Sequence, residues 1–112
     1  MFLDEKTVDG VSCISFNQER FDAAKVVQFK QFFVDAVAAG KTRLVLDLTA
    51  VKFMDSSALG AVVAVLKTVG ARGDLVLCGA TGIVAELFKL TRMDRVFVIV
   101  ASEADAVAKL NS

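Results

Sequence analysis

The sequence predicts an α/β fold: a mixed sheet that begins with a hairpin and continues with parallel strands, joined by about four helices in the order β-β-α-β-α-β-α-β-α. Asp9-Gly10 is a hairpin signal between two strand-like runs, Leu3–Val8 and Val11–Phe16. Arg43–Leu48 is almost entirely apolar, which is typical of a strand covered on both faces. The later strand-like runs alternate with segments of helical periodicity, and right-handed crossovers make such strands parallel.

The first helix is expected between the hairpin and Arg43. Asp22 is a suitable N-cap, because its carboxylate can accept a hydrogen bond from a free backbone N–H of the first turn. Gly40 is placed to end the helix, since glycine readily takes the left-handed conformation of a C′ residue. Helical spacing brings one broad apolar stripe together, and we expect it in the core: Phe29, Phe32, Phe33, Ala36 and Val37.

The second helix is expected from Ser57 to about Ala71, after the strand Arg43–Leu48 and a short loop. Its apolar stripe is predicted to comprise Leu59, Val62, Val63 and Leu66. The next strand is expected at Leu75–Cys78, and it is followed by the glycine loop Gly79–Gly82.

The remaining elements are short. Thr81 is the expected N-cap of a third helix, whose apolar stripe is predicted to be Ile83, Leu87 and Leu90. A final strand is expected at Val96–Val100. The sequence Ser102-Glu103-Ala104-Asp105 resembles a capping box and predicts a last helix.

Length and composition limit the classes of function. The 112 residues suit one domain, residues 1–112, and thirteen basic residues balance thirteen acidic ones without forming a basic stripe, so we expect no nucleic-acid partner. The first six residues lack a leader pattern, and the longest apolar run, Ala58 to Leu66, is too short for a membrane span. We therefore expect a cytoplasmic protein without a membrane partner.

The chemistry of the side chains argues against an enzyme. Histidine is absent, which excludes Ser-His-Asp and Cys-His catalysis. Cys13 and Cys78 have no metal-ligand spacing and are expected to be small buried hydrophobes. The loop Gly79–Gly82 is too short and sparse in glycine for a phosphate-binding fingerprint. We expect no cofactor, no metal and no catalytic residue.

The most informative segment is Phe53-Met54-Asp55-Ser56-Ser57, which lies between a predicted strand and a predicted helix. Free N–H groups and the positive end of the helix dipole favour an anion at such a position, so Ser57 is a candidate phosphate acceptor. From the residues alone, an N-cap role for Ser57 is the favoured interpretation. Ser56 is expected to be the structural cap or a loop-ordering hydroxyl. Phe53 and Met54 belong either to the core or to the apolar edge of a docking surface.

Two segments together resemble the signature of STAS domains: Leu44–Leu48, followed by Phe53–Gly60 with its Asp-Ser-Ser step. More narrowly, the chain resembles the single-domain anti-sigma factor antagonists of bacteria. Three further segments share the likeness: Phe21-Asp22-Ala23-Ala24, Leu75–Gly79 and Leu87 to Arg92. The resemblance implies a STAS-like fold and a regulator that switches partners.

The resemblance also implies roles for the residues. Ser57 takes the place of the serine that is phosphorylated by a kinase which is also the anti-sigma factor. The unphosphorylated form binds that partner and frees the sigma factor, and a PP2C-type phosphatase restores the serine. Asp55 either orients the Ser57 hydroxyl or contacts the kinase, or it is an exposed turn residue. Ala58 stands where many members have glycine, which should strengthen the helix start. We expect a monomer when the protein is free.

Two alternatives remain. A STAS protein can also be a regulatory subunit of a lipid-transport ATPase, or part of a larger signalling assembly, without phosphorylation of its serine. A phosphoreceiver domain would use Asp47, at a strand end, as its acceptor. That chemistry needs an acidic pair for Mg²⁺ and a lysine after the last strand, where Val100-Ala101-Ser102 stands. We expect Asp47 instead to hydrogen-bond a neighbouring loop.

Overall fold

The computed structural model describes residues 2–112 and has a five-stranded sheet in the order β1-β2-β4-β6-β7. β1 pairs antiparallel with β2, and the other neighbours are parallel, so the predicted mixed sheet is confirmed. The strands of this sheet are β1 (Leu3–Val8), β2 (Val11–Phe16), β4 (Arg43–Asp47), β6 (Asp74–Cys78) and β7 (Val98–Val100).

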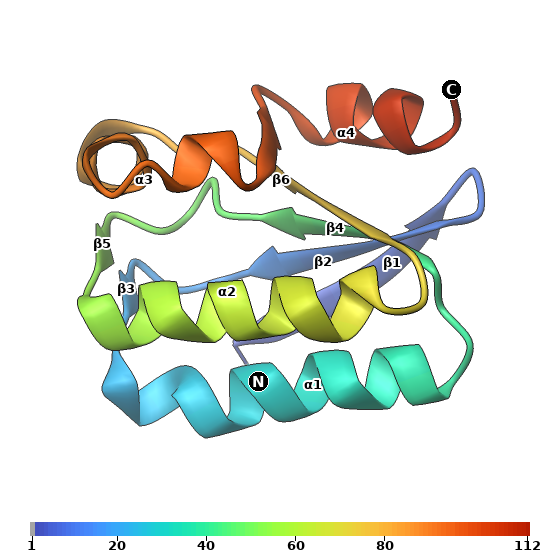
Figure 1. Cartoon of the computed structure of the whole chain (residues 1–112), viewed down its shortest axis with the longest axis horizontal. Helices are drawn as coiled ribbons and strands as arrows, with labels where there is room; N and C mark the ends of the chain where they lie inside the picture. The colour runs from blue at the N-terminus through green and yellow to red at the C-terminus, as the bar shows by residue number, and fades with distance from the viewer. Residues whose placement is uncertain (1) are drawn as a thin grey trace.

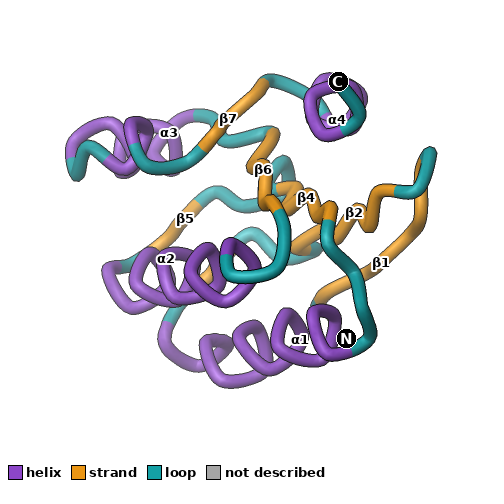
Figure 2. The backbone as a smooth tube through the Cα atoms, turned by 45° about the vertical axis from the view of Figure 1, so that its right-hand side comes forward, coloured by secondary structure: helices purple, strands orange, loops and turns teal. Residues whose placement is uncertain are grey.

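The helices lie on both faces of the sheet. α1 and α2 cover one face and α4 covers the other, while α3 lies next to β5 at the end toward which the arrowheads of β2 and β4 point (Figures 1 and 2). Two 3-10 turns, Ala23–Lys25 and Met93–Arg95, precede α1 and β7. The helices are α1 (Val26–Ala38), α2 (Ser56–Gly70), α3 (Gly82–Leu90) and α4 (Glu103–Leu110).

A second, two-stranded sheet was not predicted from the sequence. β3 (Arg20–Phe21) and β5 (Phe53–Met54) pair in parallel at the end of the main sheet. Each strand has two residues, too few for any periodicity to reveal. The predicted final strand is also shorter than expected, because the 3-10 turn Met93–Arg95 occupies the segment before it.

Of the three N-caps predicted at Asp22, Thr81 and Ser102, two make the expected capping hydrogen bond. Asp22 caps the 3-10 turn that leads into α1, and its carboxylate accepts a hydrogen bond from the Ala24 N–H at 3.2 Å. Ser102 caps α4 by accepting from the Asp105 N–H at 3.1 Å, as the capping box predicts. Thr81 is at the N-cap position of α3, but its side chain makes no capping hydrogen bond.

The apolar stripe of α1 is confirmed. Phe29, Phe33 and Ala36 are buried, and the aromatic rings continue into the sheet, with Phe29 4.7 Å from Phe21 and Phe21 stacked 4.3 Å from Phe16 (centroid distances). Aromatic pairs at such distances add about 0.5–1.5 kcal/mol each to the burial of their area. This cluster anchors α1 beside β3.

The predicted stripe of α3 is not its buried face, and that of α2 is only part of its buried face. The buried face of α3 is Val84 and Phe88, whereas Ile83 is 64% exposed and Leu90 is 77% exposed. Adjacent apolar stripes have the same helical period, so periodicity cannot tell which of them meets the sheet. In α2 the predicted stripe is mostly a half-buried flank, and the buried face consists of Ala58, Ala61, Val62, Val65 and Val69.

Asp47 ties the β4–β5 loop to the end of the main sheet. Its carboxylate accepts hydrogen bonds from the Thr49 N–H, at 2.9 Å, and from the Thr49 hydroxyl, as expected for a loop-binding residue. Gly79 lies against this pair with a φ of +75°, and a Cβ there would approach Thr49 Oγ1 to 2.1 Å. Only glycine therefore fits position 79.

Replacing Gly79 with alanine should lower the free energy of unfolding by about 2–4 kcal/mol, because the left-handed backbone and the collision with Thr49 both penalise a side chain. Gly60→Ala is the matched control, since Gly60 lies within α2 and a Cβ there meets no atom within 4 Å. It should raise stability by about 0.5–1 kcal/mol. Urea denaturation measures both, and equal stability of the two variants would contradict the packing around Thr49.

Cys13 and Cys78 are buried beneath α4, as predicted for small apolar residues. Burial, followed by the nearby Asp47 charge, raises the pKa of the Cys78 thiol to about 12. The folded state therefore keeps this thiol protonated at a pH where the unfolded chain ionises it.

This difference predicts a loss of stability at alkaline pH. The Cys78 contribution is complete below the ordinary thiol pKa and disappears as pH rises towards about 12, at up to about 1.4 kcal/mol per pH unit. Denaturation curves at pH 8, 9 and 10 should show this decline. Cys78→Ala should be less stable at pH 8 but should lose less stability per pH unit; parallel declines would argue against the raised pKa.

Candidate functional site

The small sheet determines where α2 begins. The Lys52 and Phe53 N–H groups both donate to the Glu19 carbonyl, at 2.7 and 3.0 Å, and the Asp55 N–H donates to the Phe21 carbonyl at 3.3 Å. These bonds hold the chain immediately before Ser56 against β3. The Asp-Ser-Ser step therefore sits at the end of a paired backbone and not in a free loop.

Arg20 packs on the outer side of the β3–β5 pairing. Its guanidinium lies over the Phe53 ring, 4.2 Å from the centroid, and its Nε is 2.9 Å from Asp22 Oδ2. The hydrogen bond from Arg20 holds the pKa of the Asp22 carboxyl below its usual value. Phe53 is half-buried under Arg20, whereas Met54 is 4% exposed and belongs to the core. Of these two residues, only Phe53 offers surface to a partner.

Asp55 is the N-cap of α2, which corrects the expectation that Ser56 has this role. The Asp55 backbone is extended (φ −95°, ψ 179°), and its Oδ1 accepts a hydrogen bond from the Ala58 N–H at 2.9 Å. Ser56 is the first helical residue, one position too late for an N-cap. Within residues 2–112 the Asp55 carboxylate makes no hydrogen bond to Ser57, so its predicted role in orienting that hydroxyl gains no support.

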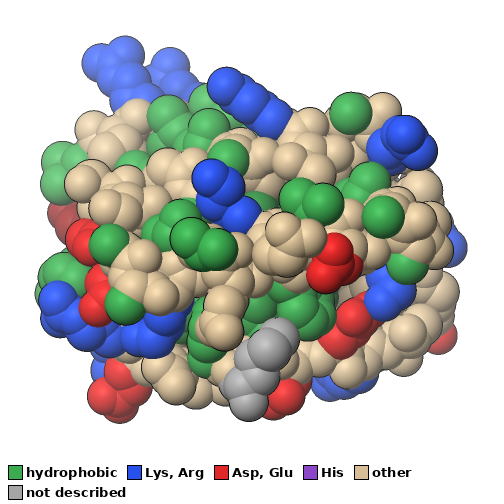
Figure 3. Space-filling model, turned by 90° about the horizontal axis from the view of Figure 1, so that it is seen from below, with side chains coloured by type: hydrophobic (Ala, Val, Ile, Leu, Met, Phe, Trp, Pro, Cys, Tyr) green, Lys and Arg blue, Asp and Glu red, His purple; other side chains and the backbone are tan. Residues whose placement is uncertain are grey.

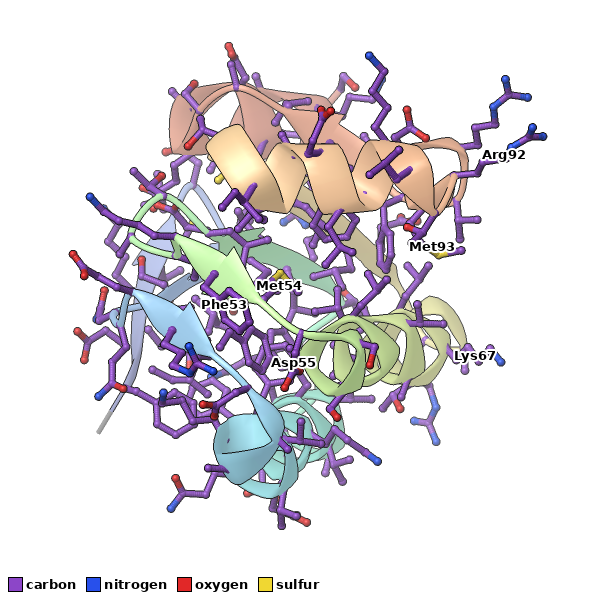
Figure 4. The ribbon with its side chains drawn as sticks, turned by 90° about the vertical axis from the view of Figure 1, so that its left-hand side faces the viewer. Phe53, Met54, Asp55, Lys67, Arg92 and Met93 are labelled. Atoms are coloured by element: carbon purple, nitrogen blue, oxygen red, sulfur yellow. The ribbon has the colours of Figure 1, made fainter. Side chains whose placement is uncertain are left out.

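Ser56 and Ser57 are exposed in the first turn of α2. Neither hydroxyl donates or accepts a hydrogen bond in the part of the chain that the structure describes. Figure 4 looks onto this end of the helix and shows Asp55 between the strand with Phe53 and Met54 and the start of α2. The serine hydroxyls are thus free for chemistry, while the cap is supplied by their neighbour.

Two electrostatic effects on a bound anion oppose each other at the start of α2. The positive end of the 15-residue α2 favours an anion by about 0.3–1 kcal/mol. The Asp55 carboxylate, next to the serines, opposes a second negative charge. The site can therefore accept an anion but does not bind one strongly.

A metal site and a phosphoreceiver both require acidic side chains in particular places. Across residues 2–112, no group of three or more Asp, Glu, Cys or His side chains could hold a metal ion. Asp47, the acceptor that a phosphoreceiver would use, is occupied by Thr49. None of the helices described is both long and apolar enough to cross a membrane.

Comparison with protein families identifies the class of this fold and site. The model of the STAS domain matches residues 3–106, so the chain belongs to the STAS domain family.

Solved structures give the nearer relationships. TM1081 of Thermotoga maritima, a candidate anti-sigma factor antagonist, is 26% identical with a TM-score of 0.91, covering 98% of this chain and 95% of that one. An anti-sigma factor antagonist of Mycobacterium paratuberculosis is 24% identical with a TM-score of 0.89 (98% and 93% covered). The phosphorylated form of the Bacillus cell fate determinant SpoIIAA is 20% identical, with a TM-score of 0.72 (96% and 97% covered). The structural neighbours thus include anti-sigma factor antagonists.

The capping geometry predicts different effects at adjacent residues. Asp55→Ala should lower the free energy of unfolding by about 1 kcal/mol, because the Ala58 N–H loses its acceptor. Ser56→Ala should change it by less than about 0.5 kcal/mol, since this exposed hydroxyl caps nothing. Chemical denaturation of both variants distinguishes the residues, and a larger loss for Ser56→Ala would return the cap to that serine.

Proposed function

We propose that this protein is an anti-sigma factor antagonist whose binding is switched by phosphorylation of Ser57. The observation that carries the proposal is the exposed Ser57 hydroxyl in the first turn of α2, next to a cap that belongs to Asp55. Adding a phosphate to Ser57 removes no hydrogen bond of the fold. The fold can therefore remain the same in both states while the surface changes.

The chemistry of the switch is electrostatic. A phosphoserine carries about −1.5 to −2 charges at pH 7. An interface that fits a neutral hydroxyl must desolvate this charge, and a penalty of about 3 kcal/mol weakens binding about 100-fold. That factor suffices to exchange one partner for another.

The proposed partners follow from the family. The unphosphorylated protein binds an anti-sigma factor that is also a serine kinase, which releases the sigma factor, and a PP2C-type phosphatase reverses the modification. The names of the Thermotoga and Mycobacterium proteins support the first partner. SpoIIAA, which has the same fold, exists in a phosphorylated form, and this supports the modification. The protein acts in the cytoplasm as a substrate of these enzymes, and its free form is a monomer.

Phosphosite mapping tests the proposal. The purified protein, Ser57→Ala and Ser56→Ala are incubated with ATP and lysate of the source cells and are then analysed by mass spectrometry. We expect phosphate on Ser57 in the wild type and in Ser56→Ala, and no phosphate in Ser57→Ala. Circular dichroism should show that all three proteins are folded.

Two other results would count against the switch. Phosphate on Ser56 in all proteins that retain it would move the acceptor by one residue. An unmodified protein in a lysate that phosphorylates other substrates would favour a constitutive subunit of a transport ATPase or of a signalling assembly.

A further inference from the structure

α3 carries an apolar stripe whose two ends are exposed, while its middle residue, Leu87, is half-buried against the core. Val84 and Phe88 fill the core, whereas Ile83 and Leu90 are 64% and 77% exposed, and Leu87 is half-buried between them. Positions 83, 87 and 90 follow helical spacing, so these three side chains form one line, which we call the α3 ridge. Contiguous apolar surface of this kind on a small protein marks an interaction site.

Cations are concentrated at the C-terminal end of the α3 ridge. Lys89, Arg92 and Arg95 are exposed, and none of them forms an ion pair with any of the residues described, 2–112. Glu86 and Asp94 are the acids of the same segment, so the cations exceed them by three to two. Figure 4 shows Arg92 projecting outward from the same side of the molecule as Lys67 of α2, with Met93 between them in that view.

Cationic and apolar side chains also lie near one another on another face of the molecule. In Figure 3, which is seen from below, Lys and Arg side chains project along the upper edge of the molecule, with apolar side chains between them. Half-buried Leu59, Val63 and Leu66 form the flank of α2 beside its buried face. The apolar surface is therefore not confined to α3.

The α3 ridge adjoins the chain that leads to Ser57. α3 packs against β5, and Ile83 lines a hollow of about 320 Å³ together with Val51 and Lys52, the residues before β5. β5 is followed directly by Asp55 and α2. A partner that reaches the Ser57 hydroxyl thus finds the ridge on the neighbouring element.

We propose that the α3 ridge, with Arg92 and Arg95 beside it, binds an amphipathic helix of the protein partner whose apolar side is flanked by Asp or Glu. This proposal rests on the proposed function, since the partner is taken to be the kinase that modifies Ser57. The apolar line accepts side chains at positions i, i+3 or i+4, and i+7 of such a helix. The unpaired guanidinium groups select for acidic residues and accelerate the encounter.

A protein surface explains these features better than a membrane does. The ridge offers three apolar side chains, and the acids Glu86 and Asp94 lie within the same segment, where they would oppose an anionic lipid surface. A partner helix can place its own charges to avoid these two acids, whereas a uniform lipid surface cannot.

The first experiment tests the chemistry without the kinase. The probe is a synthetic amphipathic helix of about 18 residues with leucines on one side and glutamates beside them, and its control has lysine in place of each glutamate. We expect the glutamate peptide to shift the backbone amide NMR signals of residues 83–96, and the lysine peptide to bind at least about tenfold more weakly. The double variant Arg92→Glu, Arg95→Glu should reverse this preference.

Two results of that titration would overturn the proposal. Amide shifts confined to residues other than 83–96, or equal binding of both peptides to the wild type, would show that the ridge and its arginines do not select an acidic helix. Sedimentation with vesicles of phosphatidylglycerol that is lost in the arginine variant, without peptide binding, would assign the surface to lipid.

The second experiment connects the ridge to Ser57. Initial rates of Ser57 phosphorylation in lysate are measured against substrate concentration for Leu90→Ser and for the arginine double variant. Val27→Ser and Lys30→Glu are matched controls on α1, since Val27 is 79% exposed and Lys30 is exposed and forms no ion pair with residues 2–112. We expect KM to rise about tenfold for the ridge variants at unchanged kcat, and less than twofold for the controls.

The two experiments separate the two proposals. Peptide binding at the ridge without any phosphorylation of Ser57 would overturn the proposed function and leave the docking surface standing. Phosphorylation of Ser57 with the same KM in ridge and control variants would overturn the docking surface and leave the switch standing.

Discussion

The parallel pairing of β3 with β5 is the constraint on which the site depends. Two residues on each side, held by backbone hydrogen bonds to Glu19 and Phe21 and covered by Arg20, bring the chain to the point where Asp55 can cap α2. This pairing positions the backbone immediately before Asp55, the residue that caps α2. The main sheet carries most of the buried core, whereas the short sheet determines where α2 begins.

Asp55 and Ser57 have different roles at the start of α2 because of this position. Asp55 satisfies the Ala58 N–H and so relieves both serines of a structural duty. A residue that caps its own helix cannot be modified without cost to the fold, whereas Ser57 is exposed and unbonded within residues 2–112. A stable framework and a changeable surface group are thereby placed two residues apart.

The sequence predicted the sheet well because its strands are long or strongly apolar, as in Val11–Phe16 and Arg43–Asp47, and because Asp9-Gly10 adopts the left-handed turn that its composition favours. The sequence did not predict β3 and β5, because two residues are too few to show the alternation of apolar and polar side chains that marks a strand. It also failed where two apolar stripes compete: which side of α3 is buried depends on contact with β5, a fact of tertiary structure. The sequence placed the Asp-Ser-Ser step correctly between a strand and a helix, but which of its residues caps the helix depended on which one has an extended backbone.

The burial of the two thiols has a consequence for their reactivity. Peroxide and disulfides react with exposed thiolates, and Cys78 is both enclosed under α4 and held in its protonated form. Oxidants therefore reach the Cys78 thiol of the folded molecule poorly. The reactivity of Cys78 depends on whether α4 and the sheet are closed over it.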